Sequence, residues 1–157
     1  MHSAIKQALL EAGDVQKTVR ALEHQKMPMG IMGICEQARE YLLELLCEQL
    51  GRPVLYVMEN NYSAKNAYLK SSIENKVYLP EPDAPLGFVD AVEQTVAQER
   101  IGALASLKRK KSVVYTTIGA LLYKMTPPEE FYASFLSIQV GKEYQRDQLI
   151  QKLVDSG

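Results

Sequence analysis

Short apolar runs alternate with helical patterns along this chain, and this alternation most constrains its fold. The runs "PVLYVM", "KVYLPEP" and "SVVYTTI" are rich in β-branched and aromatic residues, as buried strands are. Apolar residues at helical spacing separate these runs. Strands that alternate with helices predict a parallel sheet covered on both faces. We therefore predict an α/β fold, with helices on both faces of a parallel sheet.

The helical patterns carry start and stop signals of varied strength. Apolar residues between Ala38 and Leu50 form one face of a helix, and Gly51 stops it. We also expect two short helices between Ile5 and Leu22, with Asp14 capping the second, and a helix over 63–74 capped by Ser63. A long helix should run from Val89 through Leu107, and a short helix should begin at Gly119. The remaining elements are a helix with Thr126 as cap and Pro127 at its first position, a strand at "FLSIQV" and a last helix at "QRDQLIQKLVDSG".

Composition excludes several classes of protein. The 157 residues suit one compact domain and the start of another, and 46% hydrophobic with 24% charged residues is ordinary for a globular protein. A net charge of -1 argues against a broad nucleic-acid-binding surface. Cys35 and Cys47 have no second Cys or His cluster beside them, so we expect no metal site. No signal peptide or long apolar span is evident, which predicts a cytoplasmic protein without membrane contact.

The stretch "MGIMGICEQ" has the outline of a phosphate-binding loop between a strand and a helix. A working loop reads GxxxxGK[ST], in which glycines admit the phosphates, the lysine neutralises them and the hydroxyl binds magnesium. Gly30 and Gly33 fit, but Cys35 replaces the second required glycine, Glu36 the lysine and Gln37 the hydroxyl residue. We expect no useful binding of Mg-ATP. On the residues alone, "GIMGI" is equally well a strand end with two small residues.

Other polar patterns have a structural and a functional interpretation. Lys108, Arg109, Lys110 and Lys111 could contact DNA phosphates weakly, although a basic run at a helix end is more often a solvated face that favours the helix dipole. The carboxylates Glu36, Glu40 and Glu44 at helical spacing indicate a solvated acidic stripe more than an acid-base site. The tyrosines Tyr56, Tyr62, Tyr68 and Tyr78 could stack nucleic-acid bases, but part-buried packing is the favoured interpretation.

Taken in order, the degenerate loop, "GRPVLYVMENN", "YLPEPDAP", "AQERIGALASL" and "SVVYTTIGALLYKMTPPEEF" resemble the N-terminal, UvrB-like module of bacterial transcription-repair coupling factors (Mfd). The resemblance runs from about Met29 to the end and is most specific in "VVYTTIGALLYKMTPP" and "VGKEYQRDQLIQKLVDSG". It implies a degenerate P-loop domain of the helicase or UvrB domain 1A type. UvrB itself keeps an intact phosphate loop and a tyrosine-rich hairpin, whereas this chain has Glu36 and only "YLPEPDAPLGF" at those places.

The resemblance implies three segments: N-terminal helices at 1–28, a UvrB-like domain at 29–134, and at 135–157 the opening strand and helix of a truncated, UvrA-binding-type domain. It also implies no catalytic residue in this chain. ATP and magnesium would serve only a downstream motor, the translocase of a full-length coupling factor. UvrA would bind through the following domain, and RNA polymerase and DNA through downstream domains. The alternatives are a nucleotide-binding ATPase with an atypical loop and a small DNA-binding module.

Overall fold

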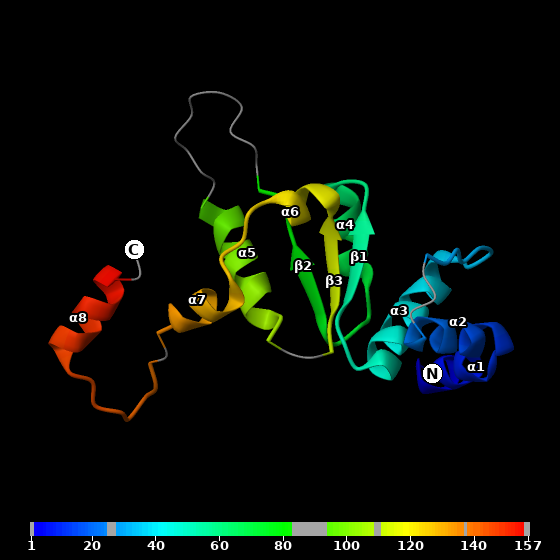
Figure 1. Cartoon of the computed structure of the whole chain (residues 1–157), viewed down its shortest axis with the longest axis horizontal. Coiled ribbons are helices and arrows are strands. Elements are labelled where there is room, and N and C mark those ends of the chain that lie inside the picture. Colours follow the sequence, from blue (N-terminus) through cyan, green and yellow to red (C-terminus); the bar gives the residue numbers. More distant parts are fainter. Residues whose placement is uncertain (1, 25–27, 83–93, 109–110, 137, 156–157) are drawn as a thin grey trace, which may run out of the picture. The chain divides into compact units, whose positions relative to one another are not determined.

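The structure is a computed structural model that describes residues 2–24, 28–82, 94–108, 111–136 and 138–155 (Figure 1). Contacts divide the chain into two compact units, Met1–Tyr123 and Lys124–Gly157. Each unit is described by itself. The segment bounds expected from the sequence, 1–28, 29–134 and 135–157, stay predictions.

A parallel three-stranded sheet forms the centre of the first unit. Its strands are β1 (Val54–Met58), β2 (Lys76–Leu79) and β3 (Val113–Thr117), in the order β1-β3-β2. The register sets Tyr56 and Tyr78 on either side of Tyr115. These strands lie where the three apolar runs predicted them, so the α/β class with a parallel sheet is confirmed.

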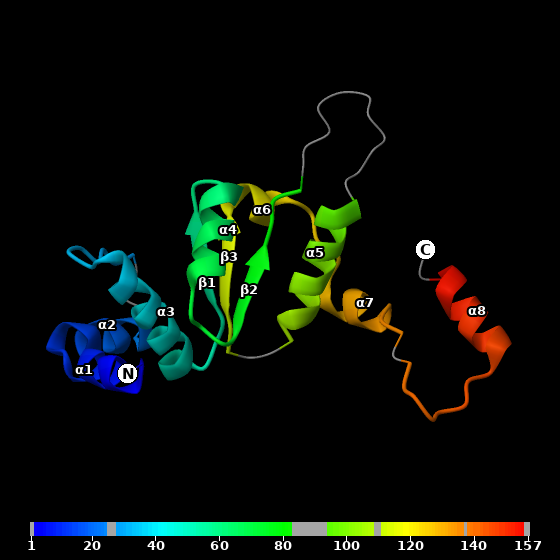
Figure 2. The same cartoon turned by 180° about the vertical axis from the view of Figure 1, so that it is seen from behind.

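Helices cover both faces of this sheet (Figures 1 and 2). On one face, α3 (Glu36–Leu50) and α4 (Asn61–Lys70) pack against the strands. On the other face, α5 (Gln94–Ser106) and α6 (Ile118–Leu122) cover β2 and β3. The remaining helices, α1 (His2–Glu11) and α2 (Gly13–Glu23), pack on α3 and reach the sheet through it.

The core on the α3 and α4 face is built around Tyr115, whose side chain is fully buried. Its ring makes edge contacts with Tyr56 and Tyr68, at centroid distances of 5.7 and 6.2 Å. Its hydroxyl donates a hydrogen bond of 2.9 Å to Ser71 Oγ, so the buried polar atom is satisfied. Burial raises the pKa of Tyr115 to about 12. Tyr78 completes this cluster, which confirms part-buried packing for three of the four tyrosines; Tyr62 is 79% exposed.

Several helix starts differ from the sequence-based expectation. The cap of α4 is Asn60, whose Oδ1 accepts a 2.8 Å bond from Ser63 N, so the prediction of Ser63 as cap was wrong. Asn is as good a cap as Ser, and the chain leaves β1 directly into it. Asp14 lies in the first turn of α2 rather than at its cap, which is Ala12, and its carboxylate accepts from Lys17 at 3.1 Å. The long helix was predicted from Val89, and its first residues lie outside those described.

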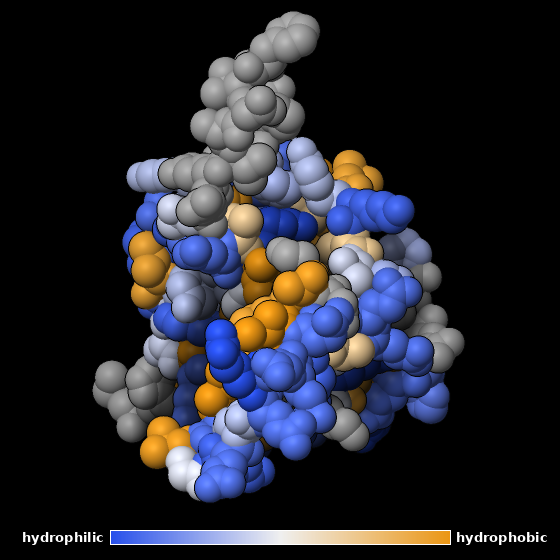
Figure 3. Space-filling model, turned by 90° about the vertical axis from the view of Figure 1, so that its left-hand side faces the viewer, coloured by the Kyte–Doolittle hydropathy of each residue, from blue (hydrophilic) through white to orange (hydrophobic). Residues whose placement is uncertain are grey.

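The second unit contains α7 (Pro128–Ala133) and α8 (Arg146–Asp155). Pro127, not Thr126, holds the cap position of α7, without a side-chain cap. The expected strand at "FLSIQV" does not form in its described residues, although the helix after it does. A strand needs a neighbouring backbone for its hydrogen bonds, and no strand of this unit offers one in the described residues. Every described side chain of the unit is exposed or half-buried. Figure 3 shows one face of the molecule, on which hydrophobic residues reach the surface.

Candidate functional site

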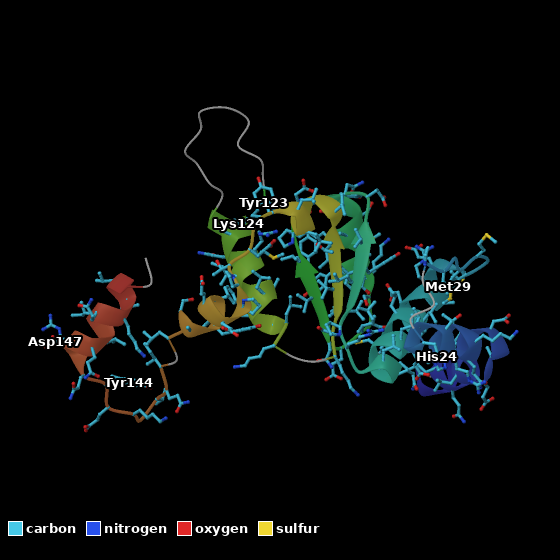
Figure 4. The ribbon with its side chains drawn as sticks, in the orientation of Figure 1. His24, Met29, Tyr123, Lys124, Tyr144 and Asp147 are labelled. Carbon is cyan, nitrogen blue, oxygen red and sulfur yellow. The ribbon has the colours of Figure 1, made fainter. Side chains whose placement is uncertain are left out.

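The glycine loop, defined as residues 28–35, precedes α3 without regular secondary structure. The alternative that "GIMGI" is a strand end is therefore wrong for these residues. Met29, Gly30 and Gly33 are all exposed, and Met32 is 95% exposed. Gly33 has φ +76°, a left-handed conformation that glycine adopts readily. The loop keeps a glycine bend, and of its residues only Ile34 is half-buried. Figure 4 shows Met29 at the base of this loop, near α3.

The start of α3 carries an anionic side chain where a phosphate loop needs a cation. Glu36 is the first residue of α3 and is exposed, and Cys35 before it is an exposed free cysteine without a side-chain cap bond. The side chain of Gln37 lies outside those described. Arg39, one turn further on, donates a 2.8 Å bond to the Tyr56 hydroxyl, which raises the pKa of Arg39. That cation is therefore turned to the strand β1.

A polar cluster at the carboxyl ends of the strands is the second candidate. Open α/β sheets bind ligands at this edge, because helices after neighbouring strands can leave on opposite faces. Here α4 follows β1 on one face and α6 follows β3 on the other. The cluster joins all three strand ends: Glu81 after β2 accepts a 3.1 Å bond from Thr117 Oγ1, and Asn61 Oδ1 accepts a 2.9 Å bond from Glu81 N.

Gly119 makes this arrangement possible. A Cβ at position 119 would overlap the carboxyl group of Glu81, so the carboxylate lies against the glycine. Thr117 Oγ1 also accepts a 3.1 Å bond from Ala120 N and so caps α6. Sequence reasoning missed Glu81 and Asn61, because their roles need three strands that are distant in sequence. The only local signal was the threonine pair followed by glycine in "TTIG".

The hydrogen bonds of the polar cluster join the ends of the three strands, and we call this arrangement of Glu81, Asn61 and Thr117 a clamp. Each of its polar side chains already has a partner, and Arg100 from α5 adds a bond to the carbonyl of Pro80. The guanidinium of Arg100 lies 5.9 Å from the ring centre of Tyr123, and burial lowers the pKa of Arg100. Tyr123 is visible near the upper end of α5 in Figure 4. The described residues contain no group of three or more His, Cys, Asp or Glu that could hold a metal ion.

The basic run lies at the opposite end of β3 from the polar cluster. Lys108 follows α5 and Lys111 precedes β3, while Arg109 and Lys110 lie outside the described residues. Lys111 lines a cavity of about 350 Å³ together with Glu44, Cys47 and Glu48. The structure therefore places acidic side chains beside Lys111, and it brings Lys111 together with neither the glycine loop nor Glu81.

The expected acidic stripe on α3 is only partly solvated. Glu44 is an ion-pair partner of Lys6 from α1, at 2.8 Å, and Glu48 pairs with the same ammonium at 3.2 Å. The prediction of a solvated stripe was wrong for Glu44, because α1 packs on that side of α3. Glu36 is exposed, as expected.

These features define a class: a parallel α/β unit in which a glycine-containing loop without the lysine and hydroxyl residue of a phosphate-binding loop precedes the helix α3. Comparison with known proteins then relates the chain distantly to UvrABC system protein B. It is 23% identical over 158 aligned residues to the proteins of Methanosarcina acetivorans and Staphylococcus epidermidis, and 22% identical to that of Staphylococcus aureus.

The similarity covers 90% of this chain but 24% of each of those relatives, so the chain spans about a quarter of their length. No family model matches the chain. Among the described residues, no helix combines the length and apolar character needed to cross a membrane.

Proposed function

We propose that this chain is a catalytically silent module of nucleotide excision repair. Its distant homology to UvrB suggests a role in that process. The carrying observation is that the parallel sheet and its two-sided core are present, while an exposed Glu36 directly after the glycine loop takes the place of the lysine. A negative charge at about 4 Å from a phosphate would turn attraction of roughly 4 kcal/mol into repulsion of similar size.

The finer proposal is that the chain is the N-terminal module of a transcription-repair coupling factor and acts in the cytoplasm. The motif resemblance in "VVYTTIGALLYKMTPP" supports it, as does the loss of the loop lysine. In this proposal the module supports recruitment of UvrA by a following domain and regulates a downstream ATP-dependent translocase that acts on DNA and RNA polymerase. The chain itself needs no cofactor.

Nucleotide binding tests the silent loop. We expect isothermal titration of the whole chain with Mg-ATP to give no binding heat, because Glu36 takes the place of the loop lysine and Arg39 is bonded to Tyr56. Micromolar affinity that is lost in Gly33→Ala would replace this proposal with the atypical ATPase.

Repair of the two DNA strands separates the coarse proposal from the finer one. Deletion of the encoding gene should slow repair of the transcribed strand of an active gene and leave the other strand unaffected. Equal slowing on both strands would support a general excision-repair role and contradict the coupling role. Unchanged repair on both strands would contradict both.

The DNA-binding alternative depends on the basic run. Binding of duplex DNA that weakens with salt, and that falls on replacement of all four residues 108–111 by alanine, would support it. The acidic neighbours of Lys111, Glu44 and Glu48, argue for the weaker effect. We expect equal DNA affinity before and after the replacement.

A further inference from the structure

The helix α3 is apolar on two opposite sides. Leu43 and Cys47 pack in the core between α3 and the sheet. Leu45 lies two positions from each of them, and an α-helix turns by about 200° over two residues, so Leu45 lies on the opposite side of α3. Its side chain is nevertheless only 1% exposed. A second layer therefore buries the side of α3 that faces away from the sheet.

The N-terminal hairpin, defined as α1 and α2, forms this second layer. Both helices contact α3. They lie on the side of α3 away from the sheet in Figures 1 and 2. Gln49, one turn after Leu45, lines a cavity of about 260 Å³ together with Leu10 of α1 and Val19 of α2. The hairpin therefore covers Leu45, and a cavity remains where the two layers meet.

The hairpin covers α3 without a buried core of its own. None of the side chains that the structure describes in α1 and α2 is buried, and Ile5 and Leu10 are each 37% exposed. The cap residue of α2, Ala12, makes no side-chain bond. Local opening costs little free energy where few apolar side chains are buried. The hairpin should therefore open more readily than the sheet, in which Val114 and Tyr115 are fully buried.

An ammonium group of α1 links the hairpin to α3. Lys6 Nζ lies 2.8 Å from Glu44 Oε1 and 3.2 Å from Glu48 Oε1. The two carboxylates lie one turn apart on α3 and repel each other, and Lys6 offsets this repulsion. The side chains of Lys6 and Glu44 are 23% and 22% exposed, so dissolved salt reaches the ion pair and should weaken it. Attachment of the hairpin thus depends on ionic strength.

We propose that the N-terminal hairpin is a salt-sensitive cover that leaves α3 as a unit while the sheet stays folded. Opening uncovers Leu45 and the apolar side of α3 around it. The glycine loop belongs to the connection between α2 and α3 and serves as the hinge, because residues 28–35 lack regular secondary structure and Gly33 has φ +76°. The sheet core does not change in this movement. The inference is independent of the proposed role in DNA repair.

Hydrogen exchange of the whole chain tests the cover. We expect the amides of α1 and α2 to exchange together and faster than those of β3. Lys6→Met keeps the aliphatic stem and removes the charge, so it should speed exchange in the hairpin about fivefold at low salt and leave β3 unchanged. The matched control is Lys17→Met, because Lys17 pairs with Asp14 inside α2. Equal exchange rates in the hairpin and β3 would overturn the proposal, as would equal effects of the two substitutions.

Thiol labelling tests whether opening uncovers α3. In a Cys35→Ser background, the thiol of Leu45→Cys should react faster than Cys47, once each rate is divided by the rate in the urea-unfolded chain. Both thiols belong to α3, but Cys47 packs against the sheet and reports opening of the sheet core. Raising the salt concentration to about 0.5 M should speed labelling of Leu45→Cys, and Lys6→Met should abolish this dependence on salt. Equal relative rates for the two thiols would contradict a hairpin that opens by itself.

Discussion

The glycine loop and the sheet behind it have opposite relations to the core. Met32 in the loop is 95% exposed, whereas Val114, Tyr115 and Thr116 in β3 are fully buried. Burial of apolar surface supplies most of the free energy of folding, and it is proportional to the area removed from water. Substitutions of the exposed loop residues should therefore leave the free energy of folding nearly unchanged, whereas substitutions of the buried residues of β3 should reduce it. A nucleotide site and its scaffold are therefore separable in this chain.

Removal of the central tyrosine should have the largest effect. Tyr115→Ala leaves a cavity between Tyr56 and Tyr68 and removes the hydrogen bond to Ser71 Oγ, so we expect the free energy of unfolding to fall by about 3–5 kcal/mol. Urea denaturation followed by circular dichroism measures it. Tyr62→Ala is the control, because Tyr62 is 79% exposed. Similar losses in the two variants would contradict the central position of Tyr115.

Alkaline pH should weaken the core through the same residue. The pKa of Tyr115 is about 12 in the fold, against 10.0 for an ordinary tyrosine. Between these values the unfolded chain has lost the proton that the folded chain keeps, so stability falls as pH rises. The difference corresponds to about 3 kcal/mol, present below pH 10 and lost as the pH rises to about 12. Denaturation at several pH values should show this loss, reduced in Tyr115→Phe.

A comparison of two glycines sharpens the contrast between loop and sheet. Gly119→Ala places a methyl group on the Glu81 carboxylate, which must move away from Thr117. We expect a loss of about 1 kcal/mol in the free energy of unfolding, as for one buried hydrogen bond. Gly30→Ala is the matched loop change, since a Cβ there meets nothing within 4 Å. Thermal unfolding that shifts equally in both variants would remove the distinction.

Charge reversal in the loop should have the smallest effect on stability. Glu36→Lys changes an exposed residue, so we expect a shift within about 0.5 kcal/mol. The same variant should gain weak affinity for polyphosphate, because Cys35 and Gln37 still lack the required chemistry. Titration calorimetry with tripolyphosphate measures the gain, and Glu40→Lys on the same helix is the control. A strong gain in Glu36→Lys alone would mean that the loop is otherwise intact.

Some errors of the sequence analysis have a common physical origin. The strands β1, β2 and β3 were predicted correctly because each apolar run pairs with a neighbouring strand, and β3 between the other two is buried throughout. The runs at "MGIMGI" and "FLSIQV" have a similar composition, but no described strand pairs with them. Strand propensity is satisfied only by a partner backbone, which a local pattern does not reveal. The cap of α4 was missed because Asn60 and Ser63 are both good caps, and the turn after β1 selects between them.

The amino-acid sequence by itself determined the alternation of strands and helices, the parallel class of the sheet and the loss of the loop's chemistry. Each depends on residue type and short-range spacing: a carboxylate at position 36 is anionic in any fold that leaves it exposed. Only the tertiary structure decided the clamp of Glu81, Asn61 and Thr117, the pairing of Lys6 with Glu44, and the cover that α1 and α2 form over α3. These features join residues far apart in sequence, because strand order and helix placement arise from packing of the whole unit.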